Sequence, residues 1–87
     1  MKIKIYYRNN LNLSPGKLSA QCCHAVLKLA RHYNWSINNL PIIVLKVSDK
    51  KYHSLKEKLS TEIFEVCDAG LTEVPPNTNT CFAYIEL

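Results

Sequence analysis

Residues 14–32, SPGKLSAQCCHAVLKLARH, decide the fold, because they form the longest predicted helix and the turn that starts it. Ser14 is a favourable N-cap, and Pro15 suits the first helical position, where its missing N–H costs nothing. Gly16 has no side chain and lets another molecule approach the backbone closely. We therefore predict a helix that begins after Ser14 and runs to about Tyr33.

The predicted helix has two unlike faces. One face is apolar and carries Leu18, Cys22, Ala25, Val26 and Leu29. The opposite face carries a polar stripe without any acid, made of Lys17, Gln21, His24, Lys28 and Arg31. Such a stripe is often only the solvated side of a surface helix, and His24 fits either role. Here every charged residue of the helix is basic, and the stripe starts at a helix N-terminus, where backbone N–H groups favour anions. The stripe therefore predicts a surface that binds phosphate.

Length and composition indicate one small globular domain. The chain has 87 residues, of which 47% are apolar and 21% charged, and its net charge is +4. This composition argues against disorder, and no apolar run approaches the ~20 residues of a membrane span. The mild positive charge is compatible with a nucleic acid partner but does not require one. Basic residues interrupt any apolar leader at the N-terminus, so we expect a cytoplasmic protein with reduced thiols.

The four cysteines, Cys22, Cys23, Cys67 and Cys81, do not predict a metal site. Cys22, Cys23 and His24 are consecutive, so on a helix their side chains point about 100° apart and do not converge on one ion. The Cys-x-x-Cys spacing of many zinc sites is also missing from the sequence. We expect no metal, no cofactor, and cysteines that fill the core.

The remaining segments alternate between strands and helices. The sequence predicts a second helix that starts after Ser48 or Asp49, and strands at residues 2–8, 42–47, 61–67 and 80–87. The continuous β-branched run at 42–47 is typical of a central strand covered on both faces. The order strand, helix, strand, helix, strand, strand predicts a single α/β domain of the three-layer type over residues 1–87. We expect a mixed, mostly parallel sheet of about four strands with flanking helices and an antiparallel last strand.

Two segments leave the carboxyl ends of predicted strands, where ligands of open α/β sheets bind. One runs from Asn9 to Gly16 with Lys17 directly behind it, and the other runs from Asp68 to Asn79. If the first and third strands are neighbours, Lys17 and Asp68 meet at one edge of the sheet. Each residue also has a local explanation, since an aspartate favours a turn and threonines cap loop backbone. The pattern alone leaves both interpretations open.

Two blocks of the sequence are long enough to indicate a family. They are GKLSAQCCHA at residues 16–25 and DAGLTEVPPNTNT at residues 68–80, with IVLKV at 43–47 between them. Both blocks are similar, in the same order, to blocks of the type II peptidyl-tRNA hydrolases of archaea and eukaryotes. The chain departs from that family in keeping only Lys17 of two lysines at the helix start and in carrying Asn10 where an aspartate is common. The segments around Trp35 and Ser60 look shortened.

The resemblance implies hydrolysis of the ester that joins a peptide to the 3′-terminal ribose of tRNA, which recycles the tRNA. It assigns catalysis to Lys17, Asp68, Thr72 and Thr80. Lys17 would stabilise the oxyanion or hold the terminal phosphates, and Asp68 would orient Lys17 and the water or accept a proton. The two threonines would position the water or the ribose through hydrogen bonds.

Two functions from different classes remain open at this point. The first is a peptidyl-tRNA hydrolase, whose RNA contacts would come from Gln21, His24, Lys28, Arg31 and Thr78. The second is a non-catalytic RNA-binding or protein-interaction module on the same fold. We expect peptidyl-tRNA as the partner of the enzyme, no membrane association, and a possible homodimer.

Overall fold

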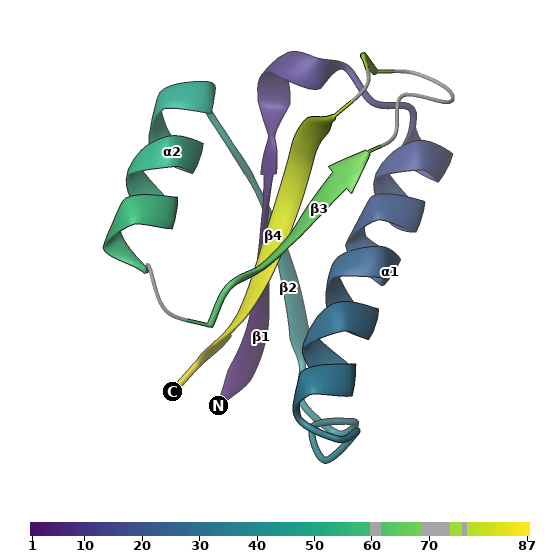
Figure 1. The fold of residues 1–87 in the computed structure, drawn as a ribbon, viewed down its shortest axis with the longest axis vertical. Coiled ribbons are helices and arrows are strands. Elements are labelled where there is room, and N and C mark those ends of the chain that lie inside the picture. The colour runs from purple at the N-terminus through teal and green to yellow at the C-terminus, as the bar shows by residue number, and fades with distance from the viewer. Residues whose placement is uncertain (60–61, 69–73, 76) are drawn as a thin grey trace.

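The computed structural model describes residues 1–59, 62–68, 74–75 and 77–87, and Figure 1 shows their arrangement. These residues form one mixed sheet of four strands in the order β2-β1-β4-β3. The strands are β1 (Lys2–Arg8), β2 (Ile42–Val47), β3 (Phe64–Asp68) and β4 (Thr78–Glu86). The helices are the short 3-10 helix η1 (Asn9–Leu11), α1 (Pro15–His32) and α2 (Asp49–Lys58). The predicted α/β class and the mixed sheet of four strands are confirmed.

The sheet is not mostly parallel in its pairing, which corrects the expectation from sequence. Among the described strands, β1 and β2 pair in parallel, whereas β4 pairs antiparallel with both β1 and β3. The reason is that β4 returns between β1 and β3, so it takes both of their inner edges. The antiparallel direction of the last strand is as predicted, but β1 and β3 are not neighbours.

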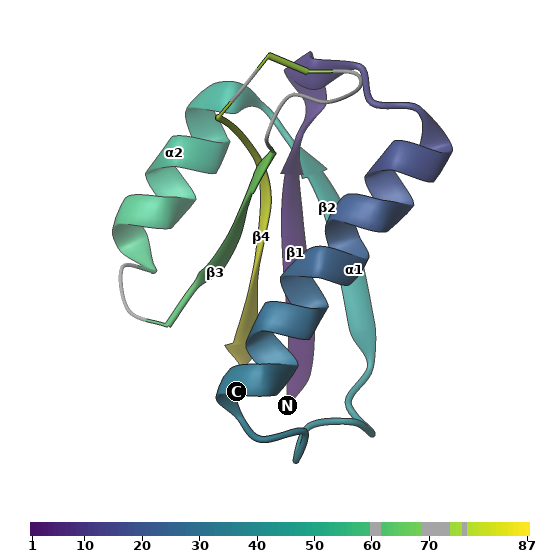
Figure 2. The ribbon, with the colours of Figure 1, turned by 45° about the vertical axis from the view of Figure 1, so that its right-hand side comes forward.

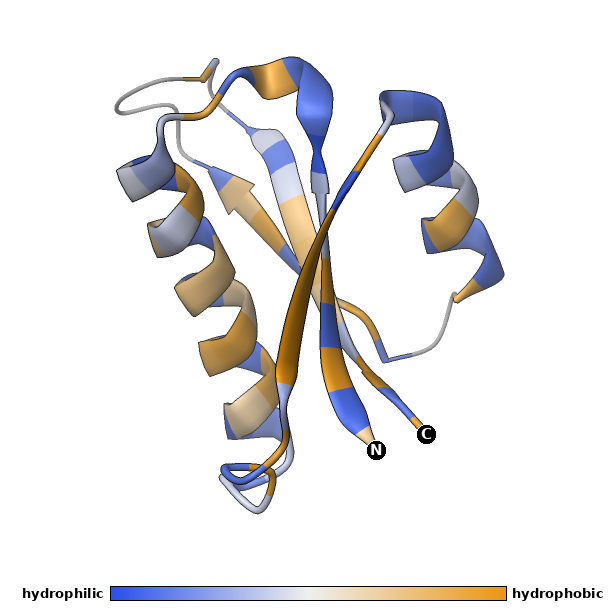
Figure 3. Cartoon of the chain, turned by 180° about the vertical axis from the view of Figure 1, so that it is seen from behind, coloured by the Kyte–Doolittle hydropathy of each residue, from blue (hydrophilic) through white to orange (hydrophobic). Residues whose placement is uncertain are grey.

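The strand β2 lies at an edge of the sheet, whereas its composition predicted a central strand. Ile42 and Val44 are 52% and 43% exposed, and Figure 3 shows hydrophobic colour along most of this strand. The exposed Ile42 and Val44 also show that one face of β2 is not fully covered, although the apolar run predicted cover on both faces. The sheet therefore has one apolar edge, at β2, without a strand partner among the described residues.

The two α-helices cover opposite faces of the sheet and make three layers, as Figure 2 shows. On the α1 face, the core consists of Ile3, Ile5, Ala25, Leu29, Val66, Cys81 and Ala83. On the α2 face, Tyr52 packs against Val47 and Phe82. Burial of these side chains is the main stabilisation of a domain of this size.

A turn at Asn12 and an N-cap at Ser14 set the start of α1. Asn12 adopts a left-handed conformation with φ of 50°, which turns the chain from η1 toward the helix. Ser14 is extended and its Oγ accepts a hydrogen bond from the Lys17 N–H at 3.3 Å, so it is the N-cap that the sequence predicts. This cap fixes the first turn of α1 and with it the backbone of Lys17.

Candidate active site

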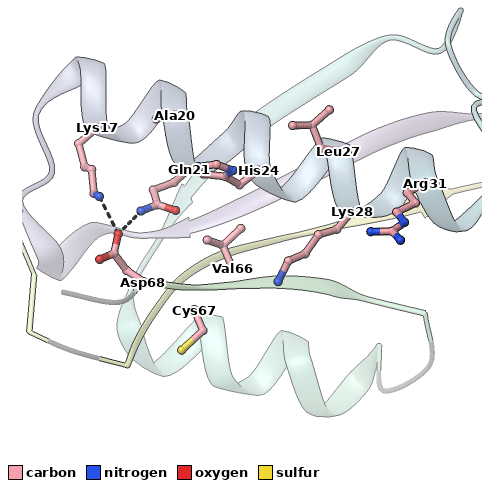
Figure 4. A pocket seen from close by; sticks show the side chains of 10 residues that line it. All are labelled: Lys17, Ala20, Gln21, His24, Leu27, Lys28, Arg31, Val66, Cys67 and Asp68. Carbon is pink, nitrogen blue, oxygen red and sulfur yellow. Dashed lines mark hydrogen bonds and ion pairs between the residues drawn. The ribbon is translucent and has the colours of Figure 1, made fainter. Parts of the chain in front are cut away.

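Three polar side chains converge where α1 begins and β3 ends, and Figure 4 shows them together. The Lys17 Nζ lies 2.7 Å from Oδ2 of Asp68, and their side chains are 18% and 6% exposed. The Gln21 Nε2 donates a hydrogen bond to the same Asp68 oxygen. A carboxylate that is nearly buried and holds two donors, one of them a cation, is a strongly organised polar centre.

The packing that brings Lys17 and Asp68 together differs from the one expected from the sequence. Because β4 separates β1 from β3, Lys17 and Asp68 do not meet through neighbouring strands. Instead, α1 packs across β4 and β3 and places its first turns over the carboxyl end of β3. Lys17 and Gln21 are four residues apart and share one helix face, so both reach Asp68.

A groove of about 480 Å³ extends from this centre between α1 and β3. Its α1 wall carries Lys17, Gln21, His24, Lys28 and Arg31, and its β3 wall includes Val66 and Asp68. Lys17 and Arg31 are 14 positions apart, which corresponds to about 21 Å along a helix. The polar stripe of the sequence is therefore one wall of a groove that ends at the Lys17–Asp68 pair (Figure 4).

Within the stripe, the side chains differ in their surroundings. His24, Lys28 and Arg31 are exposed, and the Lys28 Nζ donates a hydrogen bond to the Glu65 carbonyl oxygen at 2.9 Å. Gln21, which the sequence placed among the residues expected to contact RNA, is only 2% exposed. The reason is that Asp68 provides a buried acceptor opposite the Gln21 amide.

The threonines predicted as site residues lie in different surroundings. Thr80 is fully buried at a bulge of β4, where its Oγ1 lies 4.0 Å from the Cys81 Sγ. Thr78 is half-buried and its Oγ1 donates to the Pro75 carbonyl oxygen at 2.7 Å, which is a local turn contact. Thr72 lies outside the described residues.

The cysteines fill the core only in part. Cys81 is buried and its thiol donates to the Gln21 carbonyl oxygen, but Cys23 and Cys67 are exposed, which corrects the expectation for them. A hydrogen bond with the Cys22 thiol and burial raise the pKa of Cys81 above its usual value. Cys81 is therefore a neutral thiol and does not suit a nucleophile. In the described part of the chain, His, Cys, Asp and Glu residues form no group of three or more that could hold a metal ion.

Sequence reasoning predicted Lys17 and Asp68 as site residues but missed that Gln21 contacts Asp68. A signal was present, because Gln21 follows Lys17 by four positions and therefore shares its helix face. The contact with Asp68 joins positions 47 apart in the chain, and local periodicity carries no information on such a pair.

Fold and site together define an α/β protein with a lysine–aspartate pair at the end of a cationic groove. The family model for peptidyl-tRNA hydrolase PTH2 matches residues 1–85. A peptidyl-tRNA hydrolase of Methanopyrus kandleri is 38% identical over 89 aligned positions, which cover 88% of this chain and 77% of the relative. One of Thermococcus sibiricus is 36% identical and covers 87% of this chain and 75% of the relative. The chain belongs to the PTH2 family of peptidyl-tRNA hydrolases.

Family membership confirms the predicted resemblance and the predicted class of hydrolase acting on peptidyl-tRNA. A further relative, from Staphylothermus marinus, carries the same name at 33% identity over 87% of this chain. These comparisons favour the enzyme over the non-catalytic module.

Of the described helices, none is both long and apolar enough to cross a membrane.

Proposed function

We propose that the Lys17–Asp68 pair is the catalytic centre at which this chain hydrolyses the ester between peptide and tRNA. The observation that carries the proposal is the separation of 2.7 Å between the Lys17 Nζ and the Asp68 Oδ2 in a pair largely removed from solvent. Electrostatic groups of this kind act most strongly where water is excluded. The nearby groove supplies a place for the rest of the substrate.

The chemistry of the two groups suggests their roles. An ammonium is a donor only, so Lys17 suits the negative charge that develops on the carbonyl oxygen during attack. A carboxylate is an acceptor only, so Asp68 suits the proton that the attacking water loses. The buried hydroxyl of Thr80 lies on the strand beside Asp68, and we assign it, with Thr72, to positioning of the water or the ribose.

We assign the cationic wall of the groove to the unpaired 3′ end of the tRNA. His24, Lys28 and Arg31 follow one another along α1 and are exposed. They would contact phosphates while the ester lies at Lys17. In this assignment Gln21 is part of the catalytic end, and Thr78 contacts RNA only if its turn lies beside the bound strand.

The direct test of the function is release of peptide from an N-acetylated aminoacyl-tRNA. The parent protein is expected to release the acylated amino acid over many turnovers at a rate proportional to protein concentration. A protein that binds the tRNA tightly and releases no product would instead be the non-catalytic module.

Removing two cations from the groove should change the salt dependence of RNA binding. Lys28→Ala with Arg31→Ala should lower the slope of log affinity against log salt by about 1.5, because fewer counterions are released. Binding of tRNA is measured at several salt concentrations. Lys50→Ala with Lys51→Ala removes the same charge from exposed positions of α2 and should leave the slope nearly unchanged. Equal changes in the two double variants would contradict the assignment of the groove.

We also propose a homodimer through the exposed edge of the sheet. Strand β2 offers apolar side chains and, among the described residues, an edge of the sheet without a strand partner, and antiparallel pairing of two copies about a two-fold axis would cover both. Leu27 on α1 is 51% exposed and lines an apolar groove with Ile42 and Val44, which adds helix surface to the contact. A stable interface needs about 800 Å² from each partner, which this strand and helix must supply together.

Introducing a charge at this edge should separate the two copies. Val44→Lys is expected to shift the protein from dimer to monomer in sedimentation equilibrium, because the ammonium would be buried in the contact. Ser54→Lys places the same side chain on exposed α2 and should leave the mass unchanged. A monomeric parent protein at high concentration would overturn the proposal.

For the cellular location of the protein we propose the cytoplasm, because its four cysteines are free thiols.

A further inference from the structure

The side-chain amide of Gln21 is buried but only half satisfied. It is 2% exposed, and its Nε2 donates to the Asp68 Oδ2. Its Oε1 is also buried and has no hydrogen-bond partner among the described residues. The orientation of the amide follows from chemistry, because a carboxylate accepts only and must face the NH₂ group. The Gln21 Oε1 is therefore a buried acceptor to which no donor of the described residues is bonded.

A buried acceptor without a partner is destabilising, so its presence calls for an explanation. Gln21 lines the catalytic end of the groove, between Lys17 and His24 on the same wall. The Lys17 ammonium already lies 2.7 Å from the Asp68 carboxylate. A donor that enters the groove with the substrate is then the natural partner of the Gln21 Oε1.

We propose that the Gln21 Oε1 orients the water molecule that attacks the ester. A nucleophilic water must present a lone pair to the carbonyl carbon, which requires acceptors for its two hydrogen atoms. Lys17 has no lone pair to offer as an ammonium, whereas Gln21 and Asp68 both accept. One hydrogen of the water would point to the Gln21 Oε1 and the other to the Asp68 carboxylate. This inference rests on the proposed catalytic role of Lys17 and Asp68.

The reaction needs only water, the ester and the side chains of Lys17, Asp68 and Gln21. The water oxygen forms a bond to the carbonyl carbon, and its proton passes to Asp68 while the carbonyl oxygen becomes the oxyanion beside Lys17. The bond from that carbon to the ribose oxygen then breaks, and the ribose oxygen takes the proton from Asp68. Gln21 accepts a hydrogen bond throughout and neither gains nor loses a proton. The products are the peptide acid and tRNA with a free hydroxyl.

A competing nucleophile distinguishes orientation of water from general support of the site. In the presence of hydroxylamine, the ester yields the free acid by hydrolysis or the hydroxamate by aminolysis, and each gives the same free tRNA. Gln21→Met keeps a similar volume and removes the acceptor. It should lower hydrolysis by at least about tenfold, leave KM within about twofold, and raise the ratio of hydroxamate to acid several-fold after subtraction of the uncatalysed reaction.

An unchanged product ratio in Gln21→Met would overturn the inference, because loss of substrate or leaving-group contacts slows both reactions alike. If Gln21→Met does not fold, Gln21→Asn gives the same test, since it keeps the amide but withdraws Oε1 by one methylene. Cys23→Ser on the exposed side of α1 is the control and should keep the parental ratio. Asp68→Asn distinguishes failure of the catalytic pair from failure of the role of Gln21. Full activity in that variant refutes the catalytic pair, whereas its inactivity beside a parental ratio in Gln21→Met refutes only the role of Gln21.

Discussion

Replacing Asp68 with Asn is expected to lower single-turnover hydrolysis of peptidyl-tRNA by about 10²–10⁴-fold, the usual contribution of a general acid–base group. The amide has nearly the same shape but cannot accept the proton from the attacking water. Affinity for tRNA should persist, because the change removes a negative charge beside a cationic groove. The measurement compares the rate at saturating enzyme with the dissociation constant of the tRNA. A parental rate in the folded variant would reduce Asp68 to a structural residue.

The structure changes the expected stability of this variant. From sequence alone, Asp68→Asn would be nearly neutral, because Asn makes the same local turn. In the fold, Asp68 is nearly buried and holds both Lys17 and Gln21, so its loss leaves a largely buried ammonium without its partner. Because Lys17 can turn toward solvent, we expect a loss of about 1–3 kcal/mol. Thermal melting measures this loss, and hydrolysis must be assayed below the melting temperature of the variant.

Asp49→Asn provides a matched control for the same substitution. Asp49 Oδ1 lies 2.7 Å from Nη2 of Arg8, so it is also an aspartate in an ion pair, but at the start of α2 on the other face of the sheet. This variant should melt somewhat earlier and keep the parental single-turnover rate. A comparable loss of rate in both aspartate variants would mean that the effect of Asp68→Asn comes from destabilisation.

Local features of the fold were predictable because short segments determine them. The cap at Ser14 and the helix that follows depend on residues within one or two turns, and both appear as predicted. The antiparallel direction of β4 also follows locally, because the connection before it has no predicted helix to make a parallel crossover. The position of β2 at the edge was not predictable in this way, since it depends on β4 pairing with β1 across most of the chain.

In the candidate site, too, the residues could be predicted from short segments, but their contacts could not. Lys17 and Asp68 could be named from the sequence, because they lie in the two blocks that carry the family resemblance. Their contact was expected from neighbouring strands, but it arises from the path of α1 across the sheet. The burial of Gln21 depends on that same packing, so a helical stripe alone could not distinguish it from the exposed Lys28.

Replacing Lys17 with Met is expected to lower the single-turnover rate at saturating substrate by about 10²–10³-fold, with little effect on tRNA affinity. The reason is that a preorganised cation near the developing oxyanion stabilises the transition state more than the ground state. Met keeps most of the apolar stem of the lysine, so packing at the start of α1 should change little. The measurement again separates rate from affinity.

The double variant Lys17→Met with Asp68→Asn tests whether the two side chains act as one unit. Residues that share one catalytic step lose activity non-additively, so the double variant should be about as slow as the slower single variant. If the fold-loss of rate in the double variant equals the product of the two single losses, the ammonium and the carboxylate have independent roles. A Lys17→Met protein with the parental rate and weakened tRNA binding would assign the ammonium to the terminal phosphates. The oxyanion would then need another donor at the start of α1.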